Sequence, residues 1–179
     1  MGNPVFSPVP MDMSLVMKAA LFAEEQHRGQ VRKYTNEPYI VHPMNIARLV
    51  GLHTNDPHVI CAALLHDTVE DTNTTHNEIF KLFGIRVHEM VVALTDVGLE
   101  AGNRATRKEI NNTRIINSSS DVHLIKIFDI IDNWKTIREY DPNFAIVFRR
   151  ECRNLIDQLV DLDPHLKMNF NSELKKVRL

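Results

Sequence analysis

The chain has 179 residues, 44% of them hydrophobic and 25% charged, which is the composition of an ordinary folded protein. Its 21 basic and 23 acidic residues give a formal net charge of −2, so no overall positive field attracts nucleic acid. No apolar run is long enough to span a membrane, and the N-terminus lacks the pattern of a signal peptide. We expect a cytoplasmic protein with one domain over 1–179 that binds neither nucleic acid nor membrane; its oligomeric state is left open.

The first half of the chain is predicted to be helical. Apolar residues recur at helical spacing, and almost no stretch alternates as a strand would. Proline at a position that helices tolerate marks helix starts at His42-Pro43 and Asp56-Pro57, and Asp56 is also a capping residue. We expect a helix over about 14–26, a basic loop over about 29–39, a helix from about residue 42, and a central apolar helix over about 57–70.

The second half continues the pattern, so the predicted fold class is all-α with a core over about 12–163. Thr75 and Glu78 form a capping box, and Gly84 is a predicted helix stop. Further helices are expected over about 87–97, after the turn 98–103, from Ser119 or Ser120 to Tyr140, and from Pro142 to before Asp163-Pro164. The N-terminus and the tail from Lys167 are expected to be flexible.

Polar residues stand out where they follow a buried run. His66 and Asp67 come directly after the apolar stretch 59–65, which also makes Cys61 a predicted small buried hydrophobe. Burying a histidine and an ionised aspartate there is costly unless they are paired or bind a metal. Glu70 and Asp71 lie four residues further on, so the four polar groups are expected to share one helical face.

Two more polar residues interrupt apolar helices. Asp129 lies in a helix that is apolar nearly all round, where Asp132 and Asn133 continue its face, and His42 begins another apolar helix. Neither cysteine sits in a metal-type pair. Two histidines and two aspartates without a thiolate suit Mn²⁺, Fe²⁺ or Mg²⁺, and also admit Zn²⁺. Such a metal activates a bound water and stabilises developing negative charge.

Each of these residues has a simpler interpretation when it is taken alone. His42 fits a satisfied core histidine, Asp129 fits a partner of an arginine or lysine on another helix, and Glu70-Asp71 fits a solvated helix end. Their joint occurrence favours a metal site. The remaining histidines have no comparable setting and are interpreted as surface or packing residues: His27, His53, His58, His76, His88, His123 and His165.

Four stretches, 27–33, 37–43, 63–72 and 125–133, carry a resemblance to a known family. Their order is a basic loop, His-Pro, His-Asp-x-x-Glu-Asp, and a distant Asp with Asn four residues later. From about residue 14 to residue 140 the chain resembles the HD-domain alarmone hydrolases. These are the hydrolase half of the RelA/SpoT homologues and the stand-alone small alarmone hydrolases. The resemblance implies an HD-superfamily helical bundle with a metal site between its central helices.

The resemblance also implies a role for each matching residue. One Mn²⁺ is expected on His42, His66, Asp67 and Asp129, with Glu70 and Asp71 orienting and deprotonating the attacking water. Arg32 and Lys33 are expected to contact the nucleotide and Asn133 its ribose or phosphate region. Arg104 would add a phosphate contact, as in some bacterial stand-alone members.

The implied activity is removal of the 3′-diphosphate of (p)ppGpp to give GDP or GTP and pyrophosphate. An alternative is an HD phosphohydrolase acting on another nucleotide, such as an adenosine alarmone or the 2′-phosphate of NADPH. Another is an inactive nucleotide-binding regulatory module. Glu70-Asp71 argues against inactivity, whereas Phe128 and Ile130 favour it, because the family usually has alanine before the last metal aspartate and often a basic residue after it. The preferred base, the choice between ppGpp and pppGpp, and the physiological metal are left open.

Overall fold

The computed structural model describes residues 13–159 and 162–175, and it confirms the all-α prediction. Within these residues the only β contact is an isolated antiparallel bridge between Val31 and Pro38. The expected flexible N-terminus lies in 1–12, outside the described residues. The helices are α1 (Met13–Gln26), α2 (Val41–Val50), α3 (Pro57–Leu65), α4 (Thr68–Asp71), α5 (His76–Leu94), α6 (Arg104–Ile116), α7 (Ser120–Tyr140), α8 (Pro142–Gln158) and α9 (Pro164–Lys175), with a 3₁₀ turn at Leu99–Ala101.

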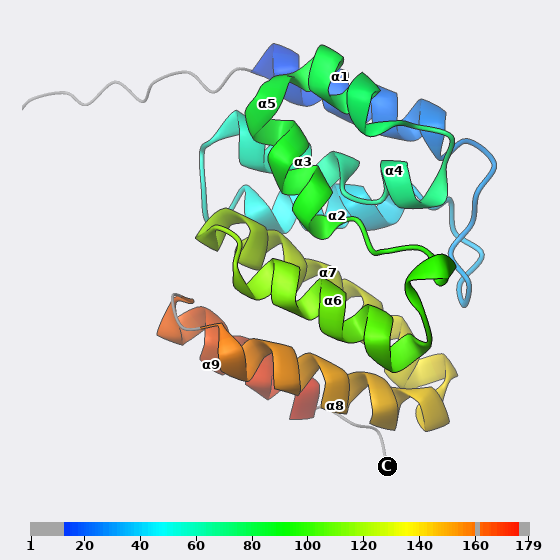
Figure 1. Ribbon diagram of the computed structural model, residues 1–179, viewed down its shortest axis with the longest axis vertical. Helices are drawn as coiled ribbons and strands as arrows, with labels where there is room; N and C mark the ends of the chain where they lie inside the picture. Colours follow the sequence, from blue (N-terminus) through cyan, green and yellow to red (C-terminus); the bar gives the residue numbers. More distant parts are fainter. Residues whose placement is uncertain (1–12, 160–161, 176–179) are drawn as a thin grey trace, which may run out of the picture.

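Helix α3 lies at the centre of the bundle. All its residues from Val59 to Leu65 are buried, and Cys61 is fully buried as predicted. It packs against α1, α2, α5 and α7, and α7 in turn contacts α8 and α9. Figure 1 shows the result: α1 to α5 occupy one half, α6 and α7 cross the middle, and α8 and α9 close the opposite end. No helix in the described part of the chain could cross a membrane.

The central helix is shorter than predicted. We expected it to run to about residue 70, but α3 ends at Leu65 and the short α4 begins at Thr68. The fully buried Thr68 donates its hydroxyl to the carbonyl oxygen of Leu65 at 2.7 Å, which satisfies a helix-end acceptor. His66 and Asp67 keep right-handed helical dihedral angles in the turn, so the polar groups still cluster.

Gly84 breaks helical geometry as predicted, but without ending the element. Its φ of +82° and ψ of 175° kink α5, which continues to Leu94 instead of starting afresh near residue 87 and reaching 97. The predicted capping box is present, with the Thr75 hydroxyl accepting from the Glu78 backbone N–H. Ser119 stands at the N-cap position of α7 but its side chain makes no capping hydrogen bond, and the helix reaches Tyr140 as predicted.

The expectation of a frayed tail from Lys167 is wrong as far as Lys175. Residues 164–175 form α9, whose Leu166, Phe170 and Leu174 are buried in the core. These residues recur every four positions and so make one apolar stripe. The indole N–H of Trp134 in α7 donates to the Glu173 carbonyl oxygen at 3.0 Å, which fixes α9 against α7.

Candidate metal centre

The four predicted ligands meet where α2, the α3–α4 turn and the middle of α7 come together. One ligand atom each of His42, His66 and Asp129 lies within 4.8 Å of the others. His42 Nε2 is 3.3 Å from Asp129 Oδ1 and 3.5 Å from Asp67 Oδ2, and His66 Nε2 is 3.1 Å from Asp67 Oδ2. Residues 42, 66–67 and 129 are therefore brought into one polar cluster inside an apolar bundle.

His66 points an unsatisfied nitrogen into this cluster. Its Nδ1 lies 2.9 Å from the Ala63 carbonyl oxygen, which can only accept, so Nδ1 carries the hydrogen in this contact. Its Nε2 is buried and has no hydrogen-bond partner, despite the short distance to Asp67. A buried polar atom without a partner calls for an explanation, and a lone pair directed at neighbouring carboxylates is the arrangement of a metal-bound histidine.

His42 is held in the same way by a carboxylate behind it. Its Nδ1 lies 2.8 Å from Asp132 Oδ2, and Asp132 also accepts hydrogen bonds from Asn45 and Arg32. Burial lowers the pKa of His42, but its hydrogen bonds to Asp129, Asp132 and Asp67 outweigh burial and raise it to about 11. Without a metal, a protonated imidazole thus supplies the positive charge that these carboxylates require.

Asp129 is oriented by two neighbours on its own helix. Lys126 Nζ donates to its Oδ2 at 2.8 Å, and Asn133 Nδ2 donates to its Oδ1 at 2.6 Å. Burial raises the pKa of Asp129, yet the Lys126 charge and the hydrogen bond from His42 hold it well below its usual range. Lys126 supplies a cation beside Asp129, while Ile130 stands where the family often has a basic residue.

The two unusual neighbours of Asp129 are accommodated by packing. Phe128 is buried, and its ring centroid lies 5.2 Å from that of the exposed His53. Ile130 is also buried and lines the cavity beside the cluster. Neither displaces the Asp129 carboxylate from His42.

The donor set fits a divalent cation. Two imidazole nitrogens and two carboxylates converge without a thiolate, and a hydrogen bond at 2.6 Å from the Tyr39 hydroxyl orients Asp67 Oδ2. Such N/O sets suit first-row divalent metals and magnesium. The cluster of His42, His66 and Asp129, with Asp67 beside it, therefore has the donor chemistry and spacing that suit a divalent metal.

A cavity of about 230 Å³ adjoins the cluster. Among its described lining residues, six carboxylates face two lysines, a strongly acidic balance for a site that would hold phosphate. The carboxylates are those of Asp67, Glu70, Asp71, Asp96, Asp129 and Glu151, and the lysines are Lys108 and Lys126. A polyanion can enter such a cavity only together with cations, which again indicates a metal.

Glu70 and Asp71 stand at the rim of this cavity. Glu70 is exposed as a whole residue, but its Oε2 accepts the Asp96 backbone N–H at 2.9 Å. Loss of solvation, helped by the charges of Asp96, Asp67 and Asp71, raises the pKa of Glu70 to about 7. Loss of solvation and the Asp67 charge also raise the pKa of Asp71. A carboxyl that titrates near neutral pH is suited to taking a proton.

The predicted substrate-binding residues divide into two groups. Arg32 donates to Asn133 Oδ1 at 3.0 Å, and Asn133 lines the cavity, so these two lie beside the metal cluster. Lys33 is exposed and donates to the Tyr34 hydroxyl instead. Arg104 forms a two-point ion pair with Glu151, which lines the cavity, although Arg104 itself does not.

Several cavity residues were missed by the sequence analysis. Asn112 of α6, Lys126 of α7 and Tyr39 of the basic loop line the cavity, beside Lys108, which belongs to the Arg104–Lys108 stretch already expected to offer phosphate contacts. Positions 108 and 112 follow Arg104 at intervals of four, so helical spacing alone could have placed them near its face. Tyr39 and Lys126 gave no signal without knowledge of how the loop and α7 pack.

Comparison with known proteins identifies similar chains. The sequence model of the HD domain matches residues 19–159. A guanosine-3′,5′-bis(diphosphate) 3′-pyrophosphohydrolase of Aquifex aeolicus is 38% identical over 154 residues, which are 85% of this chain and 21% of that protein. This chain thus spans about a fifth of that relative. The Xenopus tropicalis guanosine-3′,5′-bis(diphosphate) 3′-pyrophosphohydrolase MESH1 is 37% identical over 73% of this chain and 74% of its own length.

A solved structure has the same arrangement of helices. It is described as a metazoan orthologue of SpoT that hydrolyses ppGpp and plays a role in starvation responses. The similarity has a TM-score of 0.82 with 26% sequence identity, and it covers 95% of this chain and 98% of the other. The match extends over nearly all of both chains.

Proposed function

The chain belongs to the HD-domain family, and from that premise we propose that it is a metal-dependent hydrolase of guanosine alarmones. It removes the 3′-diphosphate of ppGpp or pppGpp and leaves GDP or GTP and pyrophosphate. Relatives named guanosine-3′,5′-bis(diphosphate) 3′-pyrophosphohydrolase and a similar structure described as hydrolysing ppGpp support this proposal. The observation that carries the proposal is the buried, partnerless Nε2 of His66, which faces carboxylates beside an acidic cavity. The proposal keeps the cytoplasmic location expected from the sequence.

His42, His66, Asp67 and Asp129 are the residues that would hold the metal, and Mn²⁺ is our choice. When bound, the metal lowers the pKa of a water and neutralises charge on the reacting phosphate. Titration of the metal-depleted protein with Mn²⁺, Fe²⁺, Mg²⁺ and Zn²⁺ tests the choice. Highest activity with another ion would assign that ion to the site in place of Mn²⁺ and would leave the four proposed ligands unchanged.

Glu70 and Asp71 activate the water in this proposal. The Glu70 carboxylate accepts a proton from the water while the water oxygen attacks the phosphorus attached to O3′. The bond from that phosphorus to O3′ breaks, the proton taken up by Glu70 passes to O3′, and pyrophosphate leaves. Asp71, one residue on, orients the water. The hydrogen bond from the Asp96 backbone fixes one oxygen of Glu70, and its other oxygen is the one we assign to the water.

Arg32, Asn133 and Lys108 hold the nucleotide. Arg32 lies next to Asn133, and Lys108 provides a cation on the cavity wall. Arginine pairs with phosphate at two points and stacks on planar bases, so Arg32 suits the nucleotide better than a lysine would. Lys33 and Arg104 remain predicted contacts. An unchanged KM in Arg104→Ala would remove Arg104 from the set, and the same measurement tests Lys33→Ala.

Hydrolysis in H₂¹⁸O tests the reaction directly. Because water attacks the phosphorus, the label is expected in pyrophosphate and not in GDP, and Glu70→Gln is expected to lower kcat by about 10²- to 10⁴-fold. Label in the nucleotide would contradict the assigned bond cleavage. A panel containing an adenosine alarmone and NADPH identifies the substrate, since faster turnover of either would overturn the guanosine assignment.

A further inference from the structure

A larger cavity lies on another face of α8, away from the metal centre. Its volume is about 520 Å³, and it is lined by residues of α7 and α8. Phe148, Glu151 and Cys152 of α8 face the acidic cavity, whereas Ala145, Arg149 and Arg153 line this one. The two cavities share no described lining residue, so they are separate sites.

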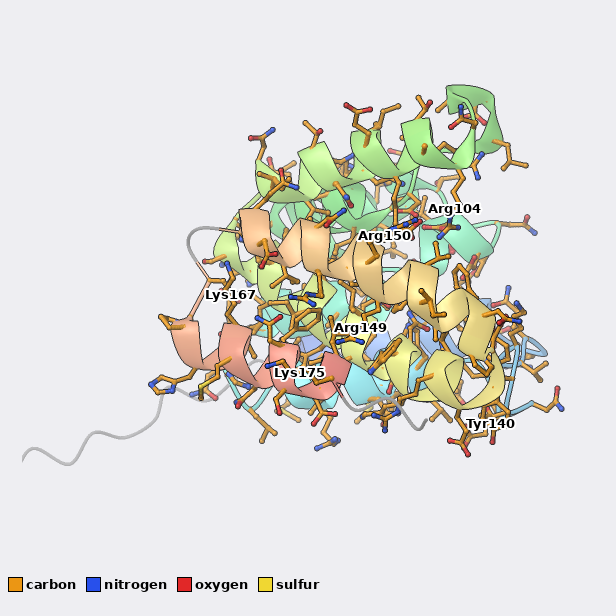
Figure 2. The ribbon with its side chains drawn as sticks, turned by 90° about the horizontal axis from the view of Figure 1, so that it is seen from below. Arg104, Tyr140, Arg149, Arg150, Lys167 and Lys175 are labelled. Carbon is orange, nitrogen blue, oxygen red and sulfur yellow. The ribbon has the colours of Figure 1, made fainter. Side chains whose placement is uncertain are left out.

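Four arginines line this second cavity: Arg138, Arg149, Arg150 and Arg153. Asp157 is the only acidic residue in the described lining. Figure 2 looks onto this end of the molecule and shows Arg149 and Arg150 on α8. In a chain with a net charge of −2, four cations around one hollow form a strong local concentration of positive charge.

Three of these arginines are not neutralised within the described part of the chain. Within residues 13–159 and 162–175, no ion pair joins an acidic side chain to Arg149, Arg150 or Arg153. Arg149 Nε is buried without a hydrogen-bond partner. This arginine therefore keeps unused hydrogen-bonding capacity beside the cavity.

Apart from the arginines, Asn154 and Asp157, the lining is apolar. Trp134 and Ala145 are buried at the cavity, and Pro142 and the exposed Ile146 line it as well. An apolar surface beside guanidinium groups suits a ligand that has a planar or apolar body and several negative charges. Arginine binds phosphate oxygens at two points and stacks on planar rings. The volume lies within the range of small-molecule sites, about 300–1,000 Å³.

We propose that this arginine cavity binds a small organic phosphate of the nucleoside polyphosphate class, at a site separate from the metal centre. The phosphates contact Arg149, Arg150 and Arg153, and the planar body lies against the apolar lining. This inference does not depend on the proposed hydrolase activity.

The chain has one tryptophan, Trp134, which lines the cavity and therefore reports on its occupancy. We would titrate the full chain with GTP, ATP and pyrophosphate in the presence of a chelator and follow tryptophan fluorescence. Saturable binding is expected for a nucleotide, and Arg149→Gln/Arg153→Gln is expected to weaken it about tenfold or more. Arg48→Gln, at an exposed position of α2, removes one positive charge elsewhere and is expected to bind like wild type.

The control variants decide the outcome. Circular dichroism tests whether the double variant is folded. If it is unfolded, Arg149→Lys replaces it: this variant keeps the charge but loses the two-point contact, and it is expected to bind the nucleotide more weakly than wild type. Loss of the signal in Arg32→Gln but not in the double variant would place it at the metal centre and overturn the proposal. Equal weakening in Arg48→Gln, or no saturation by any probe, would overturn it too. Pyrophosphate binding as tight as GTP would refute a role for the planar body.

Discussion

Asp132 is the residue whose substitution tests the metal centre most sharply without touching a ligand. Its Oδ2 lies 2.8 Å from His42 Nδ1, and the His42 ring is 1% exposed, so no water replaces this contact. In Asp132→Asn the negative charge is lost, and the new amide N–H₂ must face donors from His42, Asn45 or Arg32. We expect His42 to lose both its orientation and part of its basicity.

The expected magnitude follows from that contact. Removing a carboxylate behind a metal-bound histidine costs about 10- to 100-fold in metal affinity, or about 1.4–2.7 kcal/mol. A hydrogen bond to a charged group contributes about 1.5–3 kcal/mol, which agrees. Calorimetric titration of the metal-depleted protein with Mn²⁺ measures the change. Glu139→Gln, on the exposed side of the same helix, is the matched control. An Asp132→Asn affinity within twofold of wild type would refute the reasoning.

Three further predictions concern protons and packing. His42, whose pKa is raised to about 11, is protonated in the metal-free protein, so Mn²⁺ binding at pH 7 should release a proton. Calorimetry in buffers of different ionisation enthalpy measures the number of protons released. A binding reaction that releases no proton would contradict the prediction. The carboxyl of Glu70 should titrate near pH 7 by NMR in the metal-free protein. Since the folded state holds that proton more tightly than the unfolded chain, the associated stability should be present below about pH 4.5 and lost as pH rises through about 7, a slope that Glu70→Gln removes. Phe170→Ala should lower the free energy of unfolding by about 3–5 kcal/mol in denaturant titrations, and a loss below about 1 kcal/mol would argue against a packed α9.

Much of the fold was predictable because its signals are local. Proline after a capping aspartate marks the starts of α3 and α8, and the Thr75–Glu78 box marks the start of α5. The same Asp-Pro signal stands at Asp163-Pro164, where it opens α9. The tail was nevertheless predicted to fray, because the burial of Phe170 depends on packing against a distant part of the chain.

The candidate site was predictable to the extent that polar residues interrupt apolar runs. His66 and Asp129 show this pattern, and the structure brings them together with His42. Lys108 and Tyr39 show no such pattern, and they reach the cavity only because α6 and the basic loop fold over it. The Arg104–Glu151 pair likewise joins residues 47 positions apart, a contact that helical periodicity does not predict.

The central claim is that the protein hydrolyses a guanosine alarmone with a metal held by His66, Asp67 and the other proposed ligands. Metal-depleted protein should be incubated with ppGpp, with and without added Mn²⁺, and the products separated by ion-exchange chromatography, with Asp67→Ala as control. We predict GDP and pyrophosphate only when Mn²⁺ is present, and none from Asp67→Ala. No turnover by wild-type protein with Mn²⁺ demonstrably bound, or equal turnover without metal, would contradict the claim.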